Sequence, residues 1–153
     1  TIINKETFDI LYFKKNTSQP KVENECETIL VNGLVEYKNS LYSINKGEYN
    51  IFSLLYLLST NRGNNILDQI HLDREGKKYL CNIDFNQNNL IYTLKFNQVD
   101  EKDNGLILNT DIFSWALFLD GTIKNVKINH TENKIDFCRF KKGLMNFVAK
   151  RVE

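Results

Sequence analysis

Apolar and polar residues alternate most regularly in the middle of the chain. Between residues 79 and 85 every second side chain is apolar, and Asn82 and Asp84 occupy polar positions between them. After an Asn-rich turn at residues 86–89, the alternation resumes from Leu90 to Phe96. A period of two residues is typical of a strand with one buried face. Two such runs joined by a short turn predict a β-hairpin.

A second hairpin is predicted further along the chain. The segment 112–119 is apolar on both faces, which indicates a central strand, and it runs into Asp120-Gly121, a dipeptide favoured in two-residue hairpin turns. The segment 122–128 would be the partner strand, and 134–140 a further strand. Weaker alternation predicts three more strands, at residues 8–13, 28–31 and 34–44.

Helices are predicted at three places. The segment 47–60 is too densely apolar for a half-exposed strand, so we expect a buried helix that ends near Asn61. Residues 65–71 would add a short helical turn. Near the C-terminus, apolar residues spaced as i, i+3 and i+4 predict an amphipathic helix, with Leu144, Phe147 and Val148 on its apolar side.

Together these elements predict an α+β fold. An antiparallel β-sheet built from hairpins would carry the buried mid-chain helix and the C-terminal amphipathic helix on one face. No repeat or Pro/Gly/Ser-rich linker divides the 153 residues. We therefore expect a single globular domain over residues 1–153.

Composition narrows the class of protein. With 42% hydrophobic residues, seven Gly and one Pro, the chain should fold rather than stay disordered. Its formal net charge of +1 excludes a basic nucleic-acid arm and a strongly acidic tail. Three cysteines without a C-x-x-C pair argue against a disulfide framework. The unpaired cysteines favour a reducing compartment, so we expect a cytoplasmic protein. The most apolar stretch, 51–58, is far shorter than the roughly 20 residues that span a bilayer, so we expect no membrane segment.

Known catalytic motifs are missing from the sequence, and we expect neither an enzyme nor a cofactor or metal site. If the protein is instead an enzyme or binds a ligand, its site would be assembled around His71, Asp73 and Glu75, which lie within five residues of one another. His130, the second histidine of the chain, would complete this site. An imidazole beside carboxylates can transfer protons or bind a metal. The same segment is also typical of a solvated loop before a hairpin. Cys138, eight residues after His130, is a nucleophile only if a neighbouring group stabilises its thiolate.

Charges are segregated along the chain. Residues 22–36 hold four glutamates and no base, and residues 99–120 hold five acids and one lysine. The last fifteen residues are basic instead. Oppositely charged surfaces steer partners toward each other, although charged loops are also simply solvated. The basic C-terminal helix, with Lys141, Lys142, Lys150 and Arg151, would be the surface for nucleic acid, but without interleaved aromatics or a known motif we do not expect nucleic acid as the partner.

In general character the chain resembles the small cytoplasmic immunity proteins of bacterial polymorphic-toxin and contact-dependent growth inhibition systems. It shares with them the expected single compact α+β domain, the lack of a catalytic motif, and acidic segments such as 23–27 and 100–103. The resemblance implies a non-catalytic inhibitor that binds a cognate toxin domain and covers its active site. Because toxin nucleases are often basic, the implied interface is acidic and consists of Glu23, Glu25, Glu27, Asp100, Glu101 and Asp103. The alternatives are a small enzyme or ligand-binding domain around His71 and a nucleic-acid-binding module.

Overall fold

The computed structural model of the chain describes residues 2–4, 6, 10–19, 22–31, 34–37, 40–43, 47–60, 68–74, 77–99, 117–118 and 121–151, with the backbone alone between 13 and 43. The chain divides into two compact units. Unit 1 comprises residues 1–54, 71–79 and 98–111, and unit 2 comprises residues 55–70, 80–97 and 112–153. The expectation of one domain over the whole chain stays a prediction.

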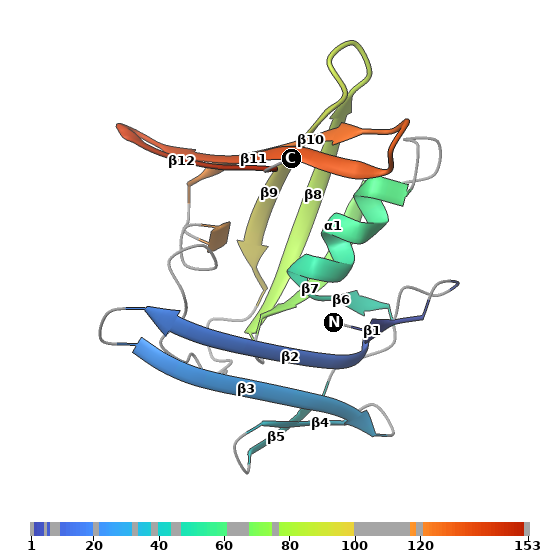
Figure 1. Cartoon of the computed structure of the whole chain (residues 1–153), viewed down its shortest axis with the longest axis vertical. Helices are drawn as coiled ribbons and strands as arrows, with labels where there is room; N and C mark the ends of the chain where they lie inside the picture. The colour runs from blue at the N-terminus through green and yellow to red at the C-terminus, as the bar shows by residue number, and fades with distance from the viewer. Residues whose placement is uncertain are drawn as a thin grey trace. The chain divides into compact units, whose positions relative to one another are not determined.

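The described part of the chain is mostly β and forms two sheets (Figure 1). The first sheet has the strand order β1-β2-β3-β4-β5, and every neighbour is antiparallel. Its strands are β1 (Ile2–Ile3), β2 (Ile10–Gln19), β3 (Val22–Val31), β4 (Leu34–Tyr37) and β5 (Ser40–Ser43). Of the three weakly predicted strands of the N-terminal part, 8–13 and 28–31 are confirmed by β2 and β3 within their described residues, whereas 34–44 forms two strands, β4 and β5.

The second sheet has the order β12-β11-β10-β9-β8-β7-β6. Its strands are β6 (Glu48–Tyr49), β7 (Gln69–Arg74), β8 (Lys77–Asn86), β9 (Ile91–Gln98), β10 (Ile123–Asn129), β11 (Lys134–Lys142) and β12 (Met145–Lys150). β6 pairs with β7 in parallel, so this sheet is mixed. The predicted strand at 134–140 is confirmed as β11.

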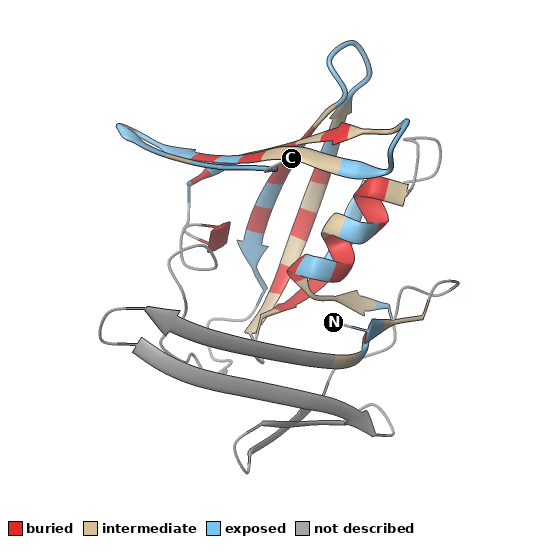
Figure 2. Cartoon of the chain, viewed as in Figure 1, coloured by how far each residue is buried: buried red, intermediate tan, exposed pale blue. Residues whose placement is uncertain are grey.

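The hairpin predicted at residues 79–96 is confirmed as β8 and β9. Along both strands buried residues alternate with more exposed ones (Figure 2), as a sheet with one covered face requires. Tyr79, Cys81 and Ile83 are buried on β8, and Tyr92, Leu94 and Phe96 are buried on β9. The rings of Phe85 and Tyr92 stack across the two strands with their centroids 4.3 Å apart.

The mid-chain helix is confirmed as α1 (Ile51–Thr60). Asn50 caps its first turn, because the Ser53 backbone N–H donates to Asn50 Oδ1 at 2.8 Å and the Asn50 N–H donates to Ser53 Oγ at 2.9 Å. Leu54 and Leu58 are fully buried, whereas Phe52 and Tyr56 are exposed. The helix is therefore buried on one side only, rather than all round.

The α+β prediction with a C-terminal helix is wrong. Residues 134–150 form the hairpin of β11 and β12, in which Lys142 pairs with Met145. Gly143 in the connecting turn has φ +54°, a conformation that glycine adopts without strain. Leu144, assigned to the apolar side of the helix, is fully exposed at the tip of this turn.

Two further predictions are wrong. The segment 112–119 is not the hairpin partner of 122–128, because β9 occupies one edge of β10 and β11 occupies the other. Its two described residues, Leu117 and Phe118, are helical and buried. The helical turn predicted at 65–71 is replaced from Gln69 onward by β7.

Candidate functional site

An ion-paired cluster lies where β6, β7 and β8 run side by side in unit 1. Lys78 Nζ is 2.5 Å from Glu48 Oε2 and 3.0 Å from Asp73 Oδ2. The side chain of Asp73 is 3% exposed and that of Glu48 11%. Burial by itself would lower the pKa of Lys78, but the two carboxylates favour the cation and the net pKa is raised above 10.5. The carboxylate of Asp73 is thus matched by a cation, which is typical of a structural ion pair.

The described residues of the predicted enzyme site belong to two different units of the chain. His71 is exposed on β7, while Asp73 is buried against Lys78. His130 belongs to unit 2, where its ring lies edge-on to Phe85 and Tyr92, at centroid distances of 6.0 and 6.2 Å. Glu75 lies outside the described residues. Within the described ranges, no three His, Cys, Asp or Glu residues are grouped as metal ligands.

The two described thiols are held in their protonated form. Cys81 and Cys138 are both free and buried. Burial raises the pKa of Cys81 to about 12 and that of Cys138 to about 11. A nucleophilic cysteine requires the opposite shift, because the thiolate is the reactive species. The structure therefore favours an inert Cys138.

The acidic residues of the predicted interface fall into two groups. Glu23, Glu25 and Glu27 occupy every second position of β3, and their register partners on β2 are Ser18, Asn16 and Lys14. β3 pairs with β4 only through Leu30 and Val31. The acidic stretch of β3 is thus paired on one side only among the described strands. Asp100, Glu101 and Asp103 lie outside the described residues.

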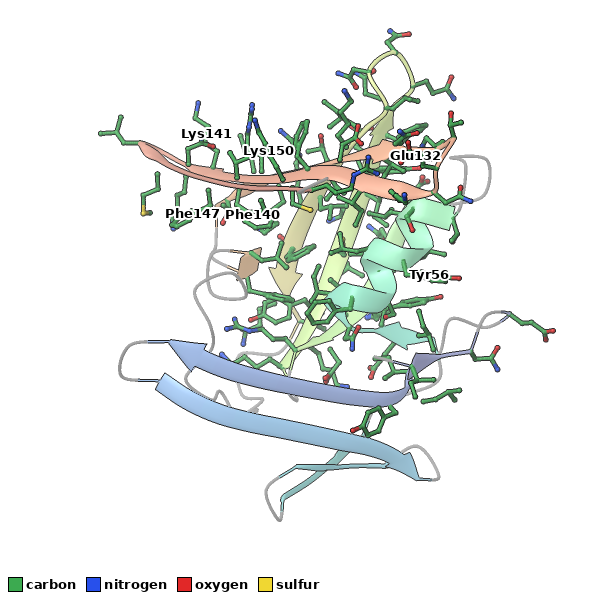
Figure 3. All side chains as sticks on the ribbon, in the orientation of Figure 1. Tyr56, Glu132, Phe140, Lys141, Phe147 and Lys150 are labelled. Carbon is green, nitrogen blue, oxygen red and sulfur yellow. The ribbon has the colours of Figure 1, made fainter. Side chains whose placement is uncertain are left out.

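Of the basic C-terminal residues, Lys141 and Lys142 lie on β11, Lys150 ends β12, and Arg151 follows that strand. Lys141 and Lys150 project from one side of the β11–β12 hairpin, and Phe140 and Phe147 from the opposite side (Figure 3). Lys142 follows Lys141 and therefore belongs to the other side. Arg151 donates to Glu132 at 2.7 Å, and this hydrogen bond lowers the pKa of Glu132.

Sequence reasoning missed two cations that share the face of Lys141 and Lys150, namely Lys127 and Lys95, and it counted Arg139 in the basic segment without placing it on this face. Lys127 is opposite Phe137, whose other neighbour is Lys150. Arg139 is two residues further along β11, and Lys95 is on β9. A signal was present, because Phe137, Arg139 and Lys141 follow the period of a strand, but the helical interpretation of the neighbouring segment obscured it.

No family model, curated protein or solved structure matches this chain. Among the described residues, no helix has the length and apolar character that a membrane span requires.

Proposed function

We propose that this chain is a non-catalytic protein that binds and inhibits a cognate toxin domain in the cytoplasm, in the manner of the immunity proteins that it resembles. The observation that carries this proposal is the regular spacing of Glu23, Glu25 and Glu27 along β3. Residues two apart in a strand occupy one face of the sheet, and the three positions extend over about 13 Å. Such a row of carboxylates complements the basic surface of a nuclease-type toxin.

The pairing of β3 adds a second argument. Residues 22–29 pair with β2 but not with another described strand. Acidic residues beside an open strand edge can meet a partner without any change in the fold. They also serve another purpose in many proteins, because charged edge strands prevent edge-to-edge aggregation.

The experiment uses the C-terminal domain of a secreted protein encoded beside this gene as the candidate toxin. Association would be measured by surface plasmon resonance at low and moderate salt for the Glu23→Gln, Glu25→Gln, Glu27→Gln triple variant. We expect the association rate to fall about tenfold and to depend less on salt, because charges of this kind act mainly on encounter.

A control variant of equal net charge carries Glu6→Gln, Asp84→Asn and Asp136→Asn, and it should bind as the wild type does. Failure of the wild-type chain to form a stoichiometric complex with that domain would contradict the inhibitor proposal. If the acidic triple binds at the wild-type rate but self-associates in size-exclusion chromatography, the glutamates protect the edge and do not form the interface.

A further inference from the structure

The exposed face of β9–β12 in unit 2 is a regular lattice of side chains. The strand registers align two rows of four residues, and a third row lies next along the strands. We call these twelve residues the outer face, and each row names its residues in the order β9, β10, β11 and β12. The first row is Ile91, Lys127, Phe137 and Lys150; the second is Thr93, Asn125, Arg139 and Val148; the third is Lys95, Ile123, Lys141 and Asn146. Every row carries at least one cation.

The cations of the outer face are available to a ligand. Lys95, Arg139, Lys141 and Lys150 are exposed, and Lys127 is half-buried. Within the described part of the chain none of them forms an ion pair, in contrast to Lys78, Lys134 and Arg151. Few acids oppose them: Asp84 on neighbouring β8 is exposed, and Asp136 interrupts the register of β10 and β11 next to Phe137.

An aromatic ring lies among these cations. The guanidinium of Arg139 lies over the ring of Phe137, 5.6 Å from its centroid. Lys127 and Lys150 are the register partners of Phe137 on the two flanking strands. The guanidinium over the ring, with a lysine on either side, offers a planar group for stacking and countercharges at the same place.

We infer that the outer face binds single-stranded nucleic acid. Proteins that bind single strands combine a positively charged track for the phosphates with aromatic or guanidinium planes on which the bases stack. A duplex keeps its base faces stacked within the helix and cannot use Phe137. An acidic protein surface supplies carboxylates, whereas a nucleic acid supplies both a negative charge and a planar base in every repeating unit. Ile123 and Val148, 55% and 41% exposed, add apolar contact area for unstacked bases.

This inference does not depend on the proposed inhibitor function, which uses β3 in unit 1. It also revises the expectation from sequence. The basic residues do not line a helix, and an aromatic residue is interleaved with them once the strands are paired.

The test is fluorescence anisotropy of the full chain with a labelled 15-nucleotide single strand, as RNA and as DNA, over a series of salt concentrations. Each neutralised phosphate contributes about −0.7 to the slope of log affinity against log salt. The Lys141→Gln, Lys150→Gln double variant should therefore reduce the magnitude of that slope by about 1.4. Phe137→Leu should weaken binding about tenfold through lost stacking and leave the slope unchanged.

The matched control is the Lys77→Gln, Lys142→Gln double variant, which removes the same charge from strand positions on the side opposite to the outer face. It should bind as the wild type does. Equal losses in the two double variants would overturn the inference, because net charge alone would then explain binding. So would the absence of binding in low salt, a duplex that binds as tightly as the single strand, or displacement by polyglutamate at an equal concentration of charge.

Discussion

The two faces of the strands β8–β12 differ sharply although they are built from alternating residues of the same segments. The inner face carries the buried core residues, including Ile83, Leu94, Val126 and Phe140. The outer face carries exposed lysines, Arg139 and the half-buried Phe137. Substitutions on the inner face should therefore change the free energy of unfolding, whereas substitutions on the outer face should change binding.

Lysine residues show the same contrast at the level of single side chains. Lys124 occupies an inner-face position and is 2% exposed. Its Nζ donates a hydrogen bond to the Thr122 carbonyl at 3.1 Å and lies 4.8 Å from the centroid of the Phe96 ring. Lys141, on the outer face, has no ion pair among the described residues. A lysine that has protein partners for its ammonium group belongs to the fold, and one that faces water is available to a ligand.

The largest expected effect comes from placing a charge on the inner face. Ile83→Asp buries an unpaired carboxylate at a cost of several kcal/mol, against a total stability of roughly 5–15 kcal/mol, so we expect the variant to unfold. Asn82→Asp is the matched control on the other face, where the residue accepts a hydrogen bond from Gln69 at 2.7 Å that a carboxylate can also accept. Equal midpoints of the two variants in urea would contradict the assignment of faces.

Two phenylalanines three residues apart on β11 provide the next comparison. Phe140 is 1% exposed, so Phe140→Ala should cost about 3–5 kcal/mol through the cavity that it leaves. Phe137→Ala removes a half-buried ring from the outer face and should cost about 1 kcal/mol or less. Urea unfolding of both variants measures the difference, and a reversed order would place Phe137 in the core.

Lys78 differs from the outer-face lysines because it forms ion pairs with Glu48 and Asp73. Lys78→Met leaves buried Asp73 without its cation, and we expect a loss of about 2–4 kcal/mol, somewhat below the range for fully buried pairs because the side chain of Lys78 is 22% exposed. Lys77→Met, one residue earlier, is the control and should have little effect.

The same pair predicts a pH dependence. The pKa of Lys78 is raised above its ordinary 10.5 in the fold, so its contribution to stability is complete below pH 10.5 and is lost as the pH rises through the raised value. The difference in stability between wild type and Lys78→Met should shrink in strongly alkaline buffer. A constant difference between pH 8 and pH 12 would argue against the ion pair.

A smaller effect is expected for the thiols. Because the pKa values of Cys81 and Cys138 are raised to about 12 and 11, neither should react with a disulfide reagent at pH 8 in the folded protein. Both should react in urea. Mass spectrometry of the labelled peptides distinguishes them from Cys26, and rapid labelling of Cys138 in the folded protein would restore it as a candidate nucleophile.

Local patterns in the sequence predicted the elements whose signal is local. Tyr79 to Phe96 alternates so regularly that the hairpin and its buried face could both be derived. The helix α1 followed from its apolar density, and the N-terminal strands from weaker alternation. The β12 strand carried a misleading signal, because five of its six residues are exposed and only Phe147 is half-buried. Leu144, Phe147 and Val148 then fitted a helical period by chance.

Strand pairing set the limit of the sequence prediction. Asp120-Gly121 suggested that the segments on either side of it pair with each other. Instead, β10 lies between β11, which follows it in the sequence, and β9, which is separated from it by more than twenty residues. The outer face could not be derived for the same reason. Lys95, Lys127 and Arg139 become neighbours only when the registers of three strands are known.

If the outer-face cations serve binding and not folding, the Lys127→Gln, Lys141→Gln, Lys150→Gln triple variant should keep its stability, which urea unfolding measures as a free energy. We predict a value within about 0.5 kcal/mol of the wild type, as is usual for surface substitutions, because none of the three lysines has an ion-pair partner among the described residues. A loss of more than about 2 kcal/mol would contradict the claim and make the outer face part of what holds the sheet together.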